Sequence, residues 1–252
     1  MTNKMQKELA GKSSNQLKNK EFLECEQWWI FALLMCVSGF YGAFTYSIRG
    51  GIFCNAQTAN FVLFAMELGN ARWEGALYYL IPMSAYLLGA VISEVVALKI
   101  KKINVIRWDT LLILIEIIIV IGLGFIPENA PYQISQVAIN FICSMQYNTF
   151  RHAKKVPMAT TFCTNHLRQT GICLVKWIRH QRDRKYLKRT VCHMGMLSVF
   201  VIGGVISSIL CKYFLGKAIW GAEVVLIIVF IDLLYADLKT EKGMLNRIPS
   251  GH

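Results

Sequence analysis

Long apolar runs alternate with short polar segments along most of this chain. Six of the runs contain few charged residues, and each has roughly the 20 residues that a helix needs to cross a bilayer core. Tryptophans stand at several run ends, as interfacial anchors do. The pattern predicts an all-α polytopic membrane protein with six transmembrane helices. We place them at Trp28–Ile48, Gly75–Leu98, Trp108–Ile126, Pro131–Phe150, His193–Leu215 and Ile219–Leu238.

The basic residues between these runs predict the orientation of the helices. Cytoplasmic connections of membrane proteins are rich in Lys and Arg. Here basic-rich and basic-poor connections alternate along the chain, and the richest stretch is Lys176–Arg189. Six spans with both termini in the cytoplasm produce this alternation, so segments 1–27 and 239–252 are expected to be cytoplasmic tails. The stretch Lys176–Arg189 is also a candidate for contact with anionic lipid headgroups.

Composition supports a membrane protein and excludes several other classes. Of the 252 residues, 55% are hydrophobic and 17% are charged, whereas soluble domains carry about 25% charged residues. The net charge of +12 lies at the ends of the apolar runs, so we expect no nucleic-acid partner. The eight cysteines contain no CxxC pair and no metal-like spacing, which predicts no metal site. Without a GxSxG, HExxH or Walker motif, we expect neither an enzyme nor a cofactor.

Two segments carry polar clusters beside apolar runs. They read "GGIFCNAQTANFVLF" from Gly50 and "PMATTFCTNHLRQTG" from Pro157. When Thr58 is placed against Thr164, the surrounding residues align locally without gaps. Each half of the chain then contains a span, a polar-headed segment and two further spans. Because three spans is an odd number, residues 131–238 would be an inverted repeat of residues 28–126.

Inverted repeats with interrupted helices are typical of secondary transporters, in which the broken segments form the site near the membrane midplane. We therefore interpret the two polar segments as re-entrant or broken half-helices, which we call motif 1 (residues 50–69) and motif 2 (residues 157–171). Two alternatives remain open at this point. Each motif could instead be an amphipathic helix lying at the interface, or a true crossing. The candidate substrate-binding residues are Asn55, Gln57, Thr58, Asn60, Gln146, Asn148, Thr164, Asn165 and His166.

Ionisable residues within membrane spans are costly and are functional candidates by default. Glu116 lies mid-run in "LLILIEIIIVIGLG" and is the strongest candidate for an ion-coupling site. Glu94 and Asp232 are further candidates, although each lies near the end of its run. Glu223 is expected to be interfacial. The alternative for Glu116 is a neutral carboxyl group that is hydrogen-bonded to another helix.

The same segments carry a family resemblance. "SGFYGAFTYSIRGGIFCNAQTANFVLF" and "FICSMQYNTFRHAKKVPMATTFCTNHLRQTG" resemble the two characteristic regions of the YoaK-type membrane proteins, a bacterial family defined by a domain of unknown function. The resemblance implies six membrane spans and an inner-membrane location, but no substrate. This chain departs from the family pattern at three places. Gly42 replaces an Asp, Ala59 replaces the Gly of a Thr-Gly-Asn triplet, and Asn165-His166 replaces the second copy of that triplet.

Two functions are compatible with these features. One is a small secondary transporter or permease for an unknown small solute, with a central site formed by the two motifs. The other is a non-transporting membrane protein with an assembly or regulatory role, in which the motifs serve helix packing. The sequence does not identify the substrate, the coupling ion or the oligomeric state, and a homo-oligomer is compatible with it.

Overall fold

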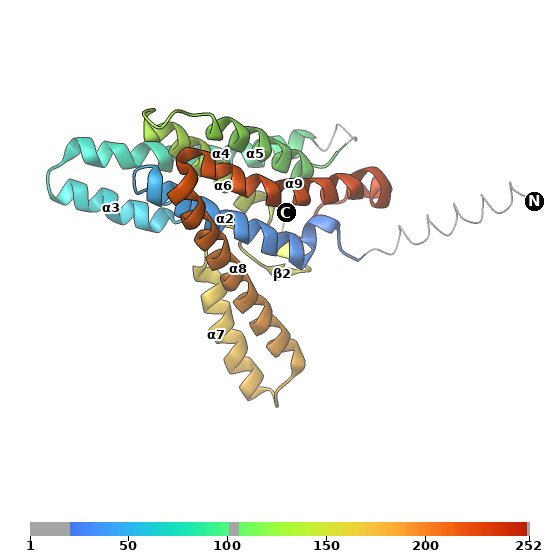
Figure 1. Cartoon of the computed structure of the whole chain (residues 1–252). Coiled ribbons are helices and arrows are strands. Elements are labelled where there is room, and N and C mark those ends of the chain that lie inside the picture. Colours follow the sequence, from blue (N-terminus) through green and yellow to red (C-terminus); the bar gives the residue numbers. More distant parts are fainter. Residues whose placement is uncertain (1–20, 101–105, 251–252) are drawn as a thin grey trace, which may run out of the picture.

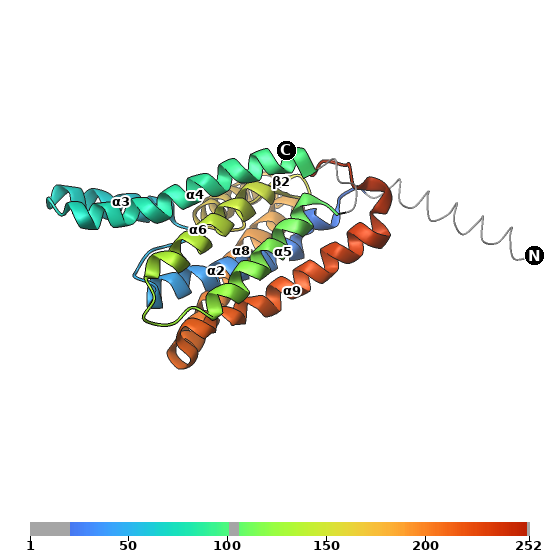
Figure 2. The ribbon, with the colours of Figure 1, turned by 90° about the horizontal axis from the view of Figure 1, so that it is seen from above.

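All six predicted apolar runs are helical in the computed structural model, which describes residues 21–100 and 106–250 (Figures 1 and 2). The N-terminal segment 1–20 and the basic connection 101–105 lie outside the described residues. Most helix ends agree with the predicted boundaries within a few residues. The six helices are α2 (Trp28–Ile48), α4 (Trp73–Ile100), α5 (Trp108–Gly124), α6 (Tyr132–Thr149), α8 (Arg184–Phe214) and α9 (Trp220–Tyr235).

Two further helices, α3 (Gln57–Gly69) and α7 (Thr164–Arg179), begin in the polar motifs. Each runs antiparallel to the next helix, so that α3–α4 and α7–α8 form two helical hairpins that project from the bundle in different directions (Figure 1). Positive φ angles at Gln181 and Arg182 end the second hairpin turn. The Asp183 side chain then accepts a hydrogen bond from Lys185 N and caps α8.

The remaining elements are short and lie at the helix ends. A two-residue strand, β1 (His152–Ala153), pairs antiparallel with β2 (Val156–Pro157) directly after α6. The other segments are single helical turns that follow or precede a long helix. They are η1 (Glu24–Glu26), η2 (Leu215–Ile219), η3 (Ala236–Thr240) and η4 (Lys242–Met244).

Helix α8 begins nine residues before the predicted position, because the end of the basic stretch is itself helical. Among the described residues, three helical stretches are long and apolar enough to cross a membrane: Trp28–Ile48, Trp73–Val96 and Arg184–Thr240. The third contains both α8 and α9, which are separated at Leu215 by a positive φ of 48°. Helix α5 has only 17 residues, and α6 carries many polar side chains. The structure is therefore that of an all-α membrane protein, although length and composition mark fewer spans than six.

Small residues allow two close helix crossings. Where α2 meets α8, a Cβ atom added to Gly39 would lie 2.0 Å from the Phe200 carbonyl oxygen, and one added to Gly203 would lie 1.9 Å from that of Cys36. Where α4 meets α6, a Cβ atom at Gly89 would lie 2.4 Å from the Phe141 oxygen. Side chains larger than hydrogen do not fit at these positions, so the backbones are in direct contact, as is common between membrane helices.

The connections gather at two ends of the bundle. At one end, Glu128 in the α5–α6 connection binds both Arg49 at the end of α2, with Nη1 to Oε2 at 3.3 Å, and the Gly216 amide between α8 and α9. At the other end, Ser250 N donates to Glu26 Oε1 over 2.9 Å. The first and last parts of the described chain therefore lie together, as an even number of passes through the bundle requires.

Candidate functional site

Motif 1 turns back along α2 instead of leaving the bundle. Gly50 and Gly51, at φ angles of +82° and +70°, reverse the chain after α2. Asn55 Nδ2 then donates to the Ser38 carbonyl oxygen over 2.9 Å. Ser38 lies ten residues before the end of α2, which is roughly 15 Å along a helix axis. The non-helical part of motif 1 therefore reaches the middle of α2, and α3 begins there.

The Asn60 side chain closes this loop. Its Nδ2 donates to the Phe53 carbonyl oxygen over 2.7 Å, and its Oδ1 accepts from the Phe53 amide over 3.3 Å. Gln57 connects the loop to α6, because its Nε2 donates to Asn140 Oδ1 over 2.7 Å. Asn60 and Asn140 are fully buried. These bonds satisfy backbone groups that an irregular segment would otherwise leave unpaired in an apolar interior.

Motif 2 is closed in the same way by a histidine. His166 Nε2 lies 2.8 Å from the carbonyl oxygen of Ala159, seven residues earlier, which is the interval that separates Asn60 from Phe53. Since a carbonyl oxygen only accepts, Nε2 carries the proton and donates. His166 Nδ1 lies 3.1 Å from Nδ1 of His193 on α8, and in the neutral pair His193 is then the donor. Both rings are buried.

Two side chains connect the motifs through the interior. Gln146 Nε2 of α6 lies 3.4 Å from the Ser38 hydroxyl oxygen and 3.5 Å from the Thr160 carbonyl oxygen of motif 2. Ser38 is also the residue whose carbonyl oxygen accepts from Asn55 of motif 1. The chain of contacts from Asn55 to Thr160 thus passes through Ser38 and Gln146, all of which are buried.

The other predicted binding residues lie away from this chain of contacts. Thr58 and Thr164, which the sequence alignment equates, are both exposed in the first turn of their helices. Asn165 accepts a hydrogen bond from Arg168 over 3.3 Å. Asn148 lies at the end of α6 with Arg151, and Arg151 Nη2 also binds Glu94 Oε2 over 2.8 Å. Glu94 is therefore part of a partly exposed ion pair at the bundle end.

Two open cavities adjoin the motifs, one each. The first, of about 310 Å³, lies between α2 and α8 and is lined by Gly42, Tyr46, Phe53 and Asn55, among others. The second, of about 480 Å³, is lined by Tyr147, Asn148, Phe162 and Asn165, among others. Ser38 and Gln146 are the sequence neighbours of Gly39, which lines the first cavity, and of Tyr147, which lines the second. The sequence predicted one central cavity shared by the two motifs, and this shared cavity stays a prediction.

Of the predicted ion-coupling residues, only Glu116 is deep in the bundle. Its side chain on α5 is 0% exposed, whereas Asp232 on α9 is half-buried. Glu223, which was expected at the interface, is 7% exposed on α9. Helix α9 packs against α2 and α5, and the interfacial depth of Glu223 in the membrane stays a prediction.

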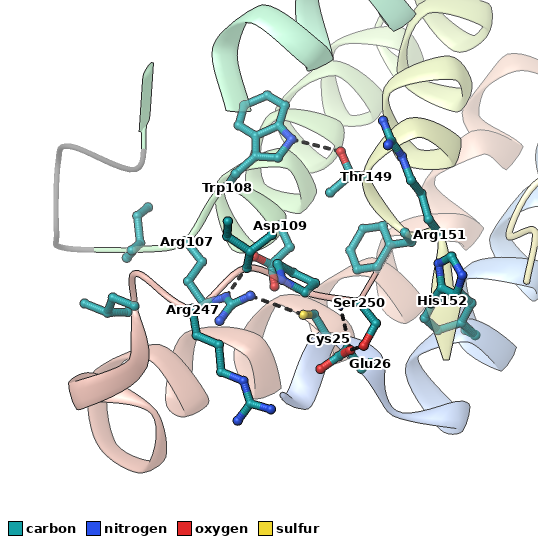
Figure 3. Close-up of a pocket in the computed structure, with 16 residues that line it drawn as sticks. Cys25, Glu26, Arg107, Trp108, Asp109, Thr149, Arg151, His152, Arg247 and Ser250 are labelled. Atoms are coloured by element: carbon teal, nitrogen blue, oxygen red, sulfur yellow. Dashed lines mark hydrogen bonds and ion pairs between the residues drawn. The ribbon is translucent and has the colours of Figure 1, made fainter. Parts of the chain in front are cut away.

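A small cavity of about 70 Å³ lies at the end of the bundle where the described termini meet (Figure 3). Arg107 contacts Asp109 and Cys25 there, and Trp108 Nε1 donates to Thr149 over 2.8 Å. Burial alone would lower the pKa of Arg107, but Asp109 and Cys25 hold it above its ordinary value. Sequence patterns did not predict this cluster, because its residues come from distant segments of the chain. Because acidic and basic groups lie together here, their ion pairs and hydrogen bonds stabilise the packing of the helix ends.

Helices with apolar outer faces, together with buried polar loops, define an all-α integral membrane protein without an evident catalytic constellation among the described residues. Residues 30–231 match a protein-family model described as "Protein of unknown function (DUF1275)". The chain belongs to this family, which confirms the resemblance to the YoaK-type proteins. No curated protein and no solved structure matches the chain.

Proposed function

We propose that this protein is a small secondary transporter or permease of the bacterial inner membrane, with both termini in the cytoplasm. Motifs 1 and 2 are its two re-entrant segments, and they belong to inverted repeats at residues 28–126 and 131–238. A small polar solute binds between them. Three kinds of evidence support this proposal: the packing of the helices, the construction of the motifs and the polarity of the buried interior.

The helix packing is what an inverted repeat requires. In the proposed repeat, α2, α4 and α5 correspond to α6, α8 and α9. Helix α2 packs against α8, and the corresponding pair, α6 and α4, is also packed. Helices α5 and α9 pack against each other, as a pair exchanged by a twofold axis does. Even the crossing points correspond, because α2 crosses α8 at Gly39 and α6 contacts Gly89 of α4 through Phe141 and Ser144.

The observation that carries the proposal is the common construction of the two motifs. A polar side chain in the first turn of α3 or α7 binds the backbone of the residue seven positions earlier. The aligned Thr58 and Thr164 are both exposed, and the aligned Asn60 and His166 are both buried. Folding a short polar loop into a bundle interior costs free energy, and membrane proteins usually keep such segments where they bind solutes or ions.

The side chains available in this region indicate the chemistry of the solute. The described residues that connect the motifs carry amides, hydroxyls and histidines, which recognise a neutral or weakly charged polar molecule through hydrogen bonds. Arg151, which also lines the second cavity, forms an ion pair with Glu94. Gly42 contributes by leaving space: a Cβ atom there would lie 3.2 Å from Asn55 Nδ2. Asn55 therefore occupies the region where the family resemblance implies an Asp, so this chain presents an amide to the solute in place of a carboxylate.

A non-transporting role is the second candidate, and one observation favours it. Asn55, Gln57 and Asn60 already bind protein groups, so motif 1 could act purely as a packing device. In that case the protein would assemble with or regulate another membrane protein. Contact of the stretch Lys176–Arg189 with anionic lipid is compatible with either role.

Flux measurements separate the two candidates. Proteoliposomes containing the purified protein would be loaded with a small-metabolite extract, and solute efflux would be followed by mass spectrometry. We expect at least one polar metabolite to leave faster than from protein-free vesicles. Gln146→Leu, which removes the contact between the motifs, should lower that efflux at least about tenfold, because correct positioning of a site contributes several kcal/mol.

The matched control is Gln133→Leu, on the first turn of the same helix α6 and outside the buried contacts between the motifs. This variant should retain the wild-type efflux. Identical efflux from protein-containing and protein-free vesicles for every metabolite would favour the non-transporting role. If Gln146→Leu and Gln133→Leu show equal efflux, transport does not depend on the contact between the motifs.

A further inference from the structure

Three helices bring acidic side chains together in the interior, apart from the contacts between the motifs. They are Tyr41 of α2, Glu116 of α5 and Glu223 of α9, with exposures of 0%, 0% and 7%. None of the oxygens of these three side chains has a hydrogen bond of acceptable geometry within the described residues. The three side chains lie on helices that pack together, because α9 contacts both α5 and α2.

The start of α9 is placed by two contacts. Trp220 Nε1 donates to the Ile121 carbonyl oxygen of α5 over 3.2 Å, and a Cβ atom added to Gly221 would lie 2.9 Å from the ring of Phe40, the neighbour of Tyr41 on α2. At this packing distance the Tyr41 hydroxyl and the two carboxyl groups influence one another electrostatically.

Among the described residues, no basic side chain is a cause of the electrostatic environment of these three groups. The Cys143 thiol on α6 is an electrostatic neighbour of Tyr41 and of Glu116, and a thiol is itself an acid. Residues packed around the cluster, such as Leu112 and Val120, are apolar and buried. Two carboxylates without a cationic partner are strongly destabilised in such an environment. The cluster is therefore stable only when it binds protons or a metal cation.

We propose that Glu116 and Glu223 form a coupled proton-binding site, in which the pair retains one proton and exchanges a second. In the doubly protonated state both carboxyl groups are neutral. Release of one O–H proton leaves a single negative charge, which the O–H groups of Tyr41 and of the other carboxylic acid can stabilise as donors. Loss of the remaining proton would place two like charges in one apolar site, and neighbouring carboxyls avoid this by retaining a proton.

The ligand set favours a proton over a metal cation. Hard cations in proteins take about six to eight oxygen ligands, whereas Tyr41, Glu116 and Glu223 offer five oxygens in total. The other neighbours are hydrocarbon side chains and a thiol, which are poor ligands for hard cations. A proton, by contrast, needs no coordination shell and no cavity volume.

The site is positioned to influence the two motifs. Tyr41 lies three residues, or nearly one helical turn, after Ser38 on α2. Ser38 contacts Asn55 of motif 1 and Gln146, which in turn contacts motif 2. A change in the charge next to Tyr41 therefore acts on the helix that carries the contacts between the motifs. This inference rests on the proposed function insofar as the exchanged proton is the coupling ion.

Infrared spectroscopy of the purified protein in lipid nanodiscs tests the proton site without a transport assay. The C=O band of protonated carboxylic acids would be recorded from pH 5 to pH 10 in choline chloride and in NaCl. We expect the wild type to lose one component above pH 6 and to keep a second up to pH 10, which is the proton that the pair retains. The retained component should be absent in Glu116→Gln and in Glu223→Gln, because a lone carboxyl group has no charged neighbour that prevents its ionisation. Tyr41→Phe should shift the midpoint of the first component to higher pH, because the carboxylate loses a hydroxyl donor. Glu74→Gln, at the exposed start of α4, is the control and should match the wild type.

A component that persists up to pH 10 in both Gln variants, or its absence from the wild type, would overturn the proposal. The proposal would also be overturned by a band whose intensity does not change with pH but decreases when NaCl replaces choline chloride. That result would assign the site to a metal cation. If a Gln variant fails to fold, an unshifted midpoint in Tyr41→Phe overturns the assignment of Tyr41 and the pair. A titrating pair in a protein that moves no solute would leave the proton site intact and refute the transporter.

Discussion

Gly203→Ala is expected to destabilise the protein by about 1–3 kcal/mol or more, because it separates α2 from α8. The added Cβ atom would lie 1.9 Å from the Cys36 carbonyl oxygen, and a backbone atom of a packed helix cannot rotate away. Relief requires one helix to shift, which also disturbs the contact of Gly39 with Phe200. The effect would be measured as the change in unfolding free energy in detergent, titrated with a denaturing surfactant.

The control for this variant lies on the same helix. A Cβ atom at Gly195 of α8 would meet nothing within 4 Å. Because Ala is a better helix former than Gly, Gly195→Ala should leave the protein unchanged or stabilise it by about 0.5–1 kcal/mol. The two substitutions are chemically identical. If Gly203→Ala lowers the unfolding free energy and Gly195→Ala does not, the difference is due to the helix crossing. Equal stabilities would contradict the packing of α2 against α8.

Asn60→Ala is expected to cost about 2–6 kcal/mol. The substitution leaves both the Phe53 amide and the Phe53 carbonyl without their side-chain partner in the interior, and each unpaired buried group costs about 1–3 kcal/mol. The same unfolding titration measures the loss. Asn70→Ala is the control, because the Asn70 side chain makes an exposed bond to the Met66 carbonyl oxygen, and surface changes usually stay within about 0.5 kcal/mol.

The equivalent position in motif 2 gives a complementary test. If the two motifs share one construction, an amide can replace the imidazole that closes motif 2. We therefore expect His166→Asn to retain most of the stability that His166→Leu loses. The Asn variant keeps a donor for the Ala159 carbonyl oxygen and gives up the contact with His193. Equal losses in both variants would contradict the correspondence between the motifs.

Hydropathy predicted the helices well because membrane spans must be long and apolar. Helix α2 begins and ends where its apolar run does. Helix α8 begins before its predicted span, since basic residues such as Arg184 and Lys188 end an apolar run but continue a helix. The local alignment of the motifs also identified Asn60 and His166 as a pair, and both proved to be buried and bound to backbone seven residues earlier.

Sequence patterns did not predict the contacts between distant segments. His193 lies in an apolar run without a motif of its own, and only the α7–α8 hairpin brings it to His166. Glu223 is near a run end, and only packing against α2 and α5 buries it. Arg107 and Asp237 are 130 positions apart, and the Arg107 amide donates to the Asp237 carboxylate over 2.9 Å. Periodicity and spacing carry no information about such pairs.

The inverted repeat is tested most directly by the sidedness of the two hairpin turns. Asn70→Cys marks the α3–α4 turn and Arg182→Cys marks the α7–α8 turn, and both positions are exposed. A membrane-impermeant maleimide would be added to bacterial cells before and after permeabilisation, with the unsubstituted protein as the baseline for its natural cysteines. We predict that Asn70→Cys reacts in intact cells and that Arg182→Cys reacts only after permeabilisation. Reaction of both cysteines from the same side of the membrane would contradict the inverted repeat and the transport site built on it.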